Sequence, residues 1–339
     1  MKQNKNDSSP PPDAVTPLET GELKDLTETI QAIRGEISKS IVGQDEVIEQ
    51  VLVTLLASGH VIVEGLPGLG KTLLVRALAK SFGGTSARVQ FTPDLMPSDI
   101  TGHVLFNLQK GIFETRRGPV FTNLLIADEI NRAPAKTQAA MLEVMQERQV
   151  SLEGKSIPLE APFMTLATQN PLEHEGTYPL PDAQLDRFLL KIEIGYASAE
   201  KEAEMVERVT AGRPGDSLPL EGIETVATAA EVIELQKAAA RVRVDRKVVD
   251  YAVRIVFETR AWPGIATGAG PRGSLALIRA ARAWALFEER GFIIPDDIKR
   301  ATIPALCHRI RLSPEMEIEG MRANEILKKL LESVEAPRQ

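Results

Sequence analysis

Five short apolar runs, separated by stretches with helical periodicity, constrain the fold of this chain more than any other feature. The runs are rich in Val, Ile, Leu and Phe, and they occur at residues 60–63, 88–91, 124–127, 163–167 and 188–192. Nearly continuous apolar strands of this kind are typical of a parallel sheet that helices cover on both faces. The pattern therefore predicts an α/β unit with a parallel five-stranded sheet.

Two further segments have the pattern of β-hairpins inserted between these strands. One spans 103–115 and the other spans 149–159, and each contains a Gly at its turn. After about residue 196 the apolar periodicity is helical only, over 199–211, 229–241, 245–260, 274–290, 295–306 and 323–334. We therefore expect a disordered tail at 1–20, an α/β domain with N-terminal helices at 21–195, and an all-helical domain at 196–339.

Composition narrows the classes of function. The net charge is −7 and aromatic residues make up only 4% of the chain, so nucleic acid is not expected as a partner. The single cysteine, Cys307, excludes an intramolecular disulfide and cannot build a zinc site alone. No run approaches 18 consecutive apolar residues, and the first residues lead into no apolar signal segment. We expect a cytoplasmic protein without a membrane span.

A segment directly after the first apolar run matches the phosphate-binding loop Gly-x4-Gly-Lys-[Ser/Thr]. It consists of Gly65, Leu66, Pro67, Gly68, Leu69, Gly70, Lys71 and Thr72. Glycines let backbone N–H groups converge on phosphate oxygens, and the following helix adds partial positive charge. Lys71 would place a full charge against the phosphates, and the Thr72 hydroxyl is a candidate ligand of Mg²⁺. An ordinary Gly-rich turn is the alternative, but the strand before the loop and the helix after it favour a site for ATP and Mg²⁺.

Polar residues follow two other apolar runs. Asp128 and Glu129 end the third run, and Asn170 lies just past the fourth. Because ligands sit at the carboxyl ends of parallel strands, we expect Asp128 to hold Mg²⁺ and Glu129 to polarise the attacking water. The amide of Asn170 can hydrogen-bond the γ-phosphate or orient that water. Each residue alone would indicate a solvated strand end or a turn, but together with the loop they predict a catalytic site.

In this order, the elements resemble the AAA+ ATPases, and more narrowly the MoxR family, over about residues 36–310. Two stretches carry most of the resemblance, GPVFTNLLIADEINRAPAKTQAAMLEVMQERQVSLEG and ATQNPLEHEGTYPLPDAQLDRFLLKI. The resemblance implies a P-loop AAA+ domain with β-hairpin insertions, followed by a helical lid. It identifies the phosphate loop as Walker A, Asp128 and Glu129 as Walker B, and Asn170 as sensor 1.

The resemblance also implies roles for residues outside these motifs. Arg187 corresponds to an arginine finger that acts on a neighbouring subunit, and Arg272 corresponds to sensor 2 of the lid; in isolation, each would be a surface charge. Residues 41–44 resemble the box on the adenine side of the nucleotide. We therefore include three more residues in the expected nucleotide contacts, namely Val42, Gly43 and Leu73.

A finger supplied by a neighbour implies a closed homo-oligomeric ring, for which a hexamer is expected. Arg132 is an alternative candidate for the contact between subunits.

The family resemblance implies a chaperone-like ATPase that hydrolyses ATP to ADP and phosphate to remodel, mature or assemble a client complex. Such clients often contain a von Willebrand A domain. The alternatives are a magnesium-chelatase-like subunit, a DNA-associated AAA+ motor and a catalytically silent nucleotide switch. The acidic charge argues against the DNA motor, and the complete set of Glu129, Asn170 and Arg187 argues against the silent switch. The sequence does not identify the client.

Overall fold

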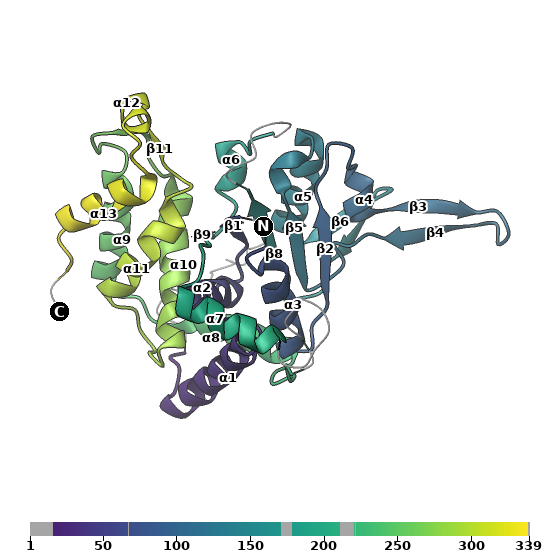
Figure 1. Ribbon diagram of the computed structural model, residues 1–339, viewed down its shortest axis with the longest axis horizontal. Helices are drawn as coiled ribbons and strands as arrows, with labels where there is room; N and C mark the ends of the chain where they lie inside the picture. The colour runs from purple at the N-terminus through teal and green to yellow at the C-terminus, as the bar shows by residue number, and fades with distance from the viewer. Residues whose placement is uncertain (1–15, 67, 171–177, 211–219, 221, 338–339) are drawn as a thin grey trace, which may run out of the picture.

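The computed structural model describes residues 16–66, 68–170, 178–210, 220 and 222–337 (Figure 1). Five parallel strands form its central sheet in the order β2-β5-β8-β1-β9, which confirms the predicted sheet. The strands are β1 (Val61–Glu64), β2 (Ser86–Gln90), β5 (Leu124–Asp128), β8 (Met164–Gln169) and β9 (Leu190–Glu193). Residues 1–15 of the predicted disordered tail lie outside the described residues.

Helices cover both faces of this sheet. Successive side chains of each strand point to opposite sides, so the apolar strands contribute to a core on each face. On β1, Val61 and Val63 contribute to one hydrophobic core and Ile62 contributes to the other. The first core also contains helices α1 (Thr20–Ser38), α2 (Asp45–Leu56) and α3 (Lys71–Ser81), whereas the second contains α4 (Pro97–Thr101) and α5 (Ala135–Glu147). The faces of the sheet are thus buried, and the carboxyl ends of the strands remain available for a site.

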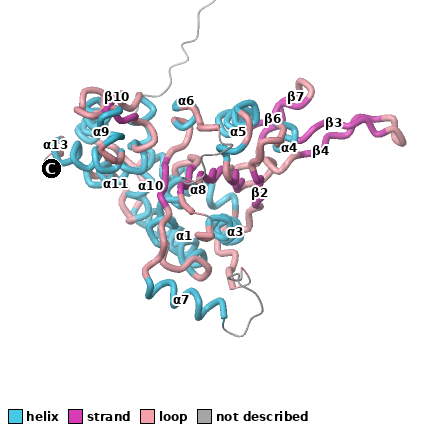
Figure 2. Tube along the Cα trace, turned by 45° about the horizontal axis from the view of Figure 1, so that its top comes forward, coloured by secondary structure: helices cyan, strands magenta, loops and turns pink. Residues whose placement is uncertain are grey.

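The two predicted hairpins are confirmed as insertions in the α/β unit. The first pairs β3 (Gly102–Asn107) with β4 (Ile112–Arg117), and the second pairs β6 (Gln149–Leu152) with β7 (Lys155–Pro158). The β3–β4 hairpin projects from the body of the molecule (Figures 1 and 2). Five of its apolar side chains are exposed, namely Leu105, Phe106, Leu108, Ile112 and Phe113, with 86% of Leu108 and 74% of Phe113 accessible to solvent.

The chain after β9 is mainly helical, as predicted. The helices are α7 (Ala199–Thr210), α8 (Ala229–Arg241), α9 (Arg246–Glu258), α10 (Pro271–Phe287), α11 (Pro295–Leu306), α12 (Pro314–Ile318) and α13 (Ala323–Ser333). The expectation that this part is all-helical needs one correction, because β10 (Ile265–Thr267) pairs antiparallel with β11 (Arg311–Leu312). Strands of two or three residues are too short to show an alternating pattern in the sequence. Among the described residues, no helix is both long enough and apolar enough to cross a membrane.

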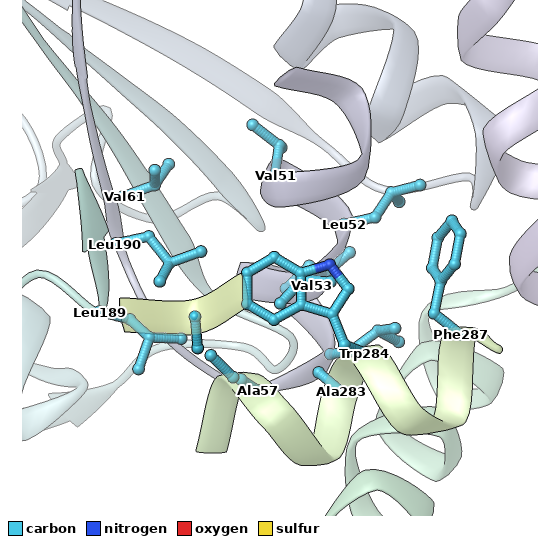
Figure 3. Close-up of a cluster of buried hydrophobic side chains, with 14 of the residues drawn as sticks. Val51, Leu52, Val53, Ala57, Val61, Leu189, Leu190, Ala283, Trp284 and Phe287 are labelled. Atoms are coloured by element: carbon cyan, nitrogen blue, oxygen red, sulfur yellow. The ribbon is translucent and has the colours of Figure 1, made fainter. Parts of the chain in front are cut away.

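Trp284 of α10 joins the lid to the α/β unit (Figure 3). Its side chain is 1% exposed, and its indole Nε1 donates a hydrogen bond to Glu49 Oε1 of α2 at 2.8 Å. The Arg300 guanidinium lies 5.3 Å from the indole ring centroid and forms an ion pair with the same Glu49. The lid therefore shares one hydrophobic core with α1, α2, α3 and one face of the sheet. This packing fixes where α10 presents its first turn.

A buried histidine, His60, lies directly before β1 and links it by hydrogen bonds to two other segments. Its Nδ1 accepts a hydrogen bond from the Thr165 backbone N–H at 3.0 Å, and its Nε2 lies 2.9 Å from the Met145 carbonyl oxygen. A neutral ring with the proton on Nε2 satisfies both contacts. Burial lowers the pKa of His60 to about 4, and the charges of Arg148 and Arg279 act in the same direction.

This pKa predicts a loss of stability in mild acid. An unfolded histidine has a pKa of about 6.5, so the unfolded chain binds more protons than the native chain between about pH 6.5 and pH 4. The free energy of unfolding should therefore fall as the pH falls through this window, by up to about 3 kcal/mol from His60 alone.

Urea denaturation at several pH values tests this prediction. The variant His60→Gln should be less stable than the wild type at pH 7, but its stability should depend less steeply on pH between about 6.5 and 4.5. Buried His308, whose pKa is also lowered, is present in both proteins and does not affect the comparison. Equal slopes in the two proteins would show that His60 is not held neutral.

Candidate active site

The predicted phosphate loop connects β1 to α3 and has the backbone that such a loop needs. Gly68 and Gly70 have φ angles of +85° and +80°, in the left-handed region that favours glycine. A Cβ on Gly65 would lie 2.2 Å from Ile194 Cγ2, so only glycine allows this close approach to the residue after β9. Pro67 lies outside the described residues. The loop leads directly into the N-terminus of α3, where backbone N–H groups attract anions.

A cavity of about 340 Å³ lies against this loop. Its lining comes from the loop, from the start of α3 and from the carboxyl ends of neighbouring strands. The lining residues are Gly68, Gly70, Lys71, Thr72, Arg88, Asp128, Glu129, Thr168 and Asn170. The structure therefore brings part of the predicted phosphate loop together with the residues predicted to contact metal and water, and it adds Arg88 and Thr168, which the sequence did not suggest. Gly65, Leu66 and Leu69 of the predicted loop do not line this cavity.

Lys71 is the first residue of α3 and folds back over its own loop. Its Nζ donates a hydrogen bond to the Gly65 carbonyl oxygen at 2.8 Å. Burial lowers the pKa of Lys71, and the nearby carboxylates of Asp128 and Glu129 oppose that shift. The ammonium group is thus held between the loop and the two carboxylates.

Asp128 is held by side chains from the strands on both sides of β5. Arg88 of β2 donates to Asp128 Oδ2 from Nε at 3.0 Å and from Nη2 at 2.6 Å. Thr168 of β8 donates to Asp128 Oδ1 at 2.5 Å. Both oxygens of the carboxylate therefore have partners within the chain, and their positions are fixed by three adjacent strands.

Glu129 follows Asp128 with an unusual backbone conformation. Its φ angle of +55° is uncommon for a residue with a side chain and is often found at functional sites. Its backbone N–H donates to Thr168 Oγ1 at 2.9 Å. Its carboxylate accepts hydrogen bonds from Gln90 Nε2 at 2.8 Å and from Arg132 Nη1 at 2.9 Å. Arg132, the alternative candidate for a contact between subunits, thus contacts Glu129 of its own chain.

The residues predicted on the adenine side lie beside the loop but outside the lining of the phosphate cavity. An added Cβ on Gly70 would lie 3.8 Å from Ile41 Cδ1, so this segment borders the loop. Gly43 has a φ angle of +74°, and a Cβ there would lie 2.9 Å from Lys201 Cβ of α7. Glycine at this position therefore lets α7 pack against the segment. Three further predicted residues, Val42, Leu69 and Leu73, are partly buried, and the two leucines pack on the core beneath the loop.

The predicted arginines lie elsewhere. Arg187 and Arg272 both line a second cavity, of about 280 Å³, and neither lines the phosphate cavity of the same chain. Arg187 follows α6 (Asp182–Leu185), and Arg272 is in the first turn of α10. The lid and the α/β unit therefore contribute one predicted arginine each to the same cavity.

Positive charge dominates this second cavity. Its charged lining residues are Arg148, Arg187, Arg272, Arg279, Arg309 and a single carboxylate, Asp186. Arg309 pairs with Asp186 at 2.8 Å, and Arg272 lies 3.8 Å from the same carboxylate. The buried Nε of Arg187 has no hydrogen-bond partner among the described residues. The cavity thus has a charge that suits an anion.

Comparison with known proteins shows the family of the fold. Residues 60–190 match the model of the ATPase family associated with various cellular activities (AAA), and residues 257–330 match the AAA lid domain. A solved structure of a putative ATPase from Cytophaga hutchinsonii superposes with a TM-score of 0.86 at 39% identity, covering 93% of this chain and 97% of that one.

Two curated bacterial proteins are similar over most of their length. The chain is 45% identical over 303 residues to the uncharacterized protein YeaC of Bacillus subtilis, covering 89% of this chain and 93% of YeaC. It is 43% identical over 321 residues to Chaperone MoxR1 of Mycobacterium tuberculosis, covering 91% of this chain and 83% of MoxR1. Because these similarities extend through both the sheet and the lid, the chain belongs to the MoxR family of AAA+ ATPases.

Proposed function

We propose that the protein binds ATP with Mg²⁺, hydrolyses it to ADP and phosphate, and uses the energy to remodel, mature or assemble a protein client. The observation that carries this proposal is the meeting of Lys71, Asp128 and Glu129 in one cavity beside the phosphate loop. Membership of an ATPase family supports the reaction. The role on a client rests on similarity to a protein named as a chaperone.

The donor groups of the cavity fit Mg²⁺. This ion prefers oxygen ligands and is usually held by one or two carboxylates together with substrate phosphates. Asp128 supplies a carboxylate and Thr72 a hydroxyl to the lining of the same cavity. Among the described residues, no cluster of three or more His, Cys, Asp or Glu side chains could hold a metal without the nucleotide. When bound, Mg²⁺ would neutralise charge that develops on the phosphates.

Three side chains would share the remaining chemistry. Lys71 would bind the phosphates, and Glu129 would polarise the attacking water from the adjoining strand end. Asn170 would orient that water or the terminal phosphate through its amide. The hydrogen bonds from Gln90 and Arg132 hold the Glu129 carboxylate in place at the cavity wall.

The second cavity supports a site that is completed between subunits. Arg187 and Arg272 lie away from the phosphate loop of their own chain, in a cavity with excess positive charge. Such a cavity suits the terminal phosphate of a nucleotide held by a neighbouring subunit. Contacts of this head-to-tail kind close into rings, and we propose a homo-oligomeric ring, with six subunits expected.

Exposed apolar side chains on the β3–β4 hairpin support contact with a protein partner. Phe106 and Phe113 pair across the hairpin with ring centroids 5.0 Å apart, yet both side chains are exposed. Projecting apolar groups of this kind are typical of interaction sites. That the client contains a von Willebrand A domain, and that the protein is cytoplasmic, stay predictions. The magnesium-chelatase alternative has less support, because relatives with that name are less similar to this chain than Chaperone MoxR1.

The variant Lys71→Ala should lose ATP binding, because Lys71 supplies the ammonium charge of the phosphate loop. An equilibrium titration with a fluorescent ATP analogue measures the affinity. Arg76→Ala, which removes the same charge from an exposed position on α3, serves as the control. An affinity of Lys71→Ala within about threefold of the wild type would contradict the assignment of the loop.

Glu129→Gln should bind ATP with nearly unchanged affinity but hydrolyse it at least about 100-fold more slowly, since groups that activate water contribute about 10²–10⁴ to rate. Asp128 and Lys71 remain in this variant, and the new amide oxygen can still accept hydrogen bonds. Phosphate release under saturating ATP gives the rate. Turnover close to that of the wild type would mean that another residue activates the water.

Arg187→Ala should retain ATP binding in isolated subunits but lose hydrolysis, because its guanidinium would act on the neighbour's nucleotide. Mixing Arg187→Ala with Lys71→Ala subunits should restore part of the activity, since a subunit with an intact loop can then receive Arg187 from a loop-deficient neighbour. Phosphate release from each variant and from the mixture measures this rescue.

Two controls make the mixing experiment decisive. Size determination with ATP present must show that both variants still form assemblies. Absence of rescue within intact assemblies would refute the action of Arg187 between subunits. Rescue of Arg132→Ala but not of Arg187→Ala would assign the intersubunit role to Arg132 instead.

A further inference from the structure

Arg88 lies in the phosphate cavity, and the proposed function gives it no role. It is on β2, an edge strand of the sheet, next to β5. The register pairs Arg88 with Ile126 and Gln90 with Asp128, so the Arg88 side chain extends along its strand to reach Asp128. Its Nε and Nη2 both donate to Asp128 Oδ2, and Nη2 also donates to Gln90 Oε1 at 2.8 Å.

These contacts cover the carboxylate that the proposed function assigns to Mg²⁺. Arg88 occupies Oδ2, while Thr168 occupies Oδ1. The Asp128 side chain is 16% exposed, whereas 51% of the Arg88 side chain is exposed. The carboxylate is therefore held inside the site, and the guanidinium is the partner that can turn into solvent at little cost.

We propose that Arg88 is the counter-ion of Asp128 in the nucleotide-free protein and that it competes with Mg²⁺ for this carboxylate. The inference rests on the proposed binding of ATP with Mg²⁺. A guanidinium nitrogen 2.6 Å from Oδ2 places a like charge where a divalent cation would approach. Arg88 must move away, or be repelled, before Asp128 can serve the metal.

The same geometry predicts opposite effects of Arg88 in the presence and absence of Mg²⁺. Without metal, Arg88 neutralises Asp128 and so reduces its repulsion of the phosphates. With metal present, Mg²⁺ neutralises Asp128 more effectively than Arg88 does, and the positive charge of Arg88 then opposes the binding of Mg²⁺. Arg88 therefore acts through Asp128 as a positioning residue that sets how strongly nucleotide binding depends on Mg²⁺.

Equilibrium binding of a non-hydrolysable fluorescent ATP analogue tests this, because it needs no catalytic activity. Affinities are measured with excess EDTA and with saturating Mg²⁺, and their ratio is the stimulation by metal. Arg88→Ala should bind the analogue more weakly in EDTA, and its stimulation should exceed that of the wild type by about three- to tenfold, the range expected for a charged, partly exposed pair.

Two further variants provide controls. Arg88→Lys keeps the charge but not the two-nitrogen contact with Oδ2, so its stimulation should lie between those of the wild type and Arg88→Ala. Arg76→Ala removes an exposed arginine from α3, outside the cavity, and should leave the ratio unchanged. A stimulation in Arg88→Ala equal to or smaller than that of the wild type would overturn the inference.

Thermal unfolding separates competition from a permanent structural ion pair. Without nucleotide, Arg88→Ala should melt at a lower temperature than the wild type, because Asp128 has lost its counter-ion. Saturation with Mg²⁺ and the analogue should reduce this difference, since the metal then stabilises Asp128 in both proteins. A difference of the same size in both states would show that the pair persists in the loaded site, and would overturn the inference.

Binding to the wild type distinguishes failure of the proposed function from failure of the role of Arg88 alone. Absence of Mg²⁺-stimulated binding of the analogue to the wild type would remove the proposed function, and the inference with it. Normal stimulation in the wild type, together with the same ratio in Arg88→Ala, would contradict the role of Arg88 alone.

Discussion

The parallel arrangement of the sheet is the constraint on which the candidate groups of the phosphate cavity depend. Because β1, β5 and β8 run in the same direction, the phosphate loop, Asp128 and Asn170 all lie at the carboxyl ends of their strands, on the same side of the sheet. The order of the strands also allows hydrogen bonds between neighbouring strands at these carboxyl ends. Thr168 of β8 donates to Asp128 and accepts from the Glu129 backbone, so one hydroxyl positions both acidic residues. An antiparallel partner in the middle of the sheet would separate these groups.

Charge is divided between two places in the molecule. The phosphate cavity holds two carboxylates with their cations, whereas the second cavity holds an excess of arginines around Asp186. Arg272, in the first turn of α10, lines the same cavity as Arg187 and does not line the phosphate cavity. In the proposed ring, the excess positive charge of one subunit would meet the phosphates bound by the next. Hydrolysis would then require assembly.

Much of this fold was predictable because its strands are buried on both faces and its lid helices have clear periodicity. The five strands and both hairpins appear where apolar runs and glycine turns indicated them. The β10–β11 pair was missed because its strands have too few residues to show alternation. Residues 1–15 and Pro67 lie outside the described part of the chain, so those predictions remain untested.

The candidate site was predictable where a motif is local and unpredictable where it depends on strand order. Lys71, Thr72 and Asp128 lie in or beside short recognisable segments. Arg88 and Thr168 are single residues within strands, and their contacts with Asp128 exist only because β2, β5 and β8 are neighbours. Arg88 and Gln90 do share one face of β2, and this spacing of two residues is the one local signal that they act together.

In the proposed ring, a complete catalytic site would exist only between subunits. The specific rate of ATP hydrolysis by the wild type, measured across a dilution series together with the sedimentation of the same samples, tests this most directly. We expect the rate per subunit to fall at least about tenfold as assemblies dissociate, because an arginine supplied by a neighbour contributes about 10³–10⁵ to the rate. A rate per subunit that stays constant in samples containing only monomers would contradict it.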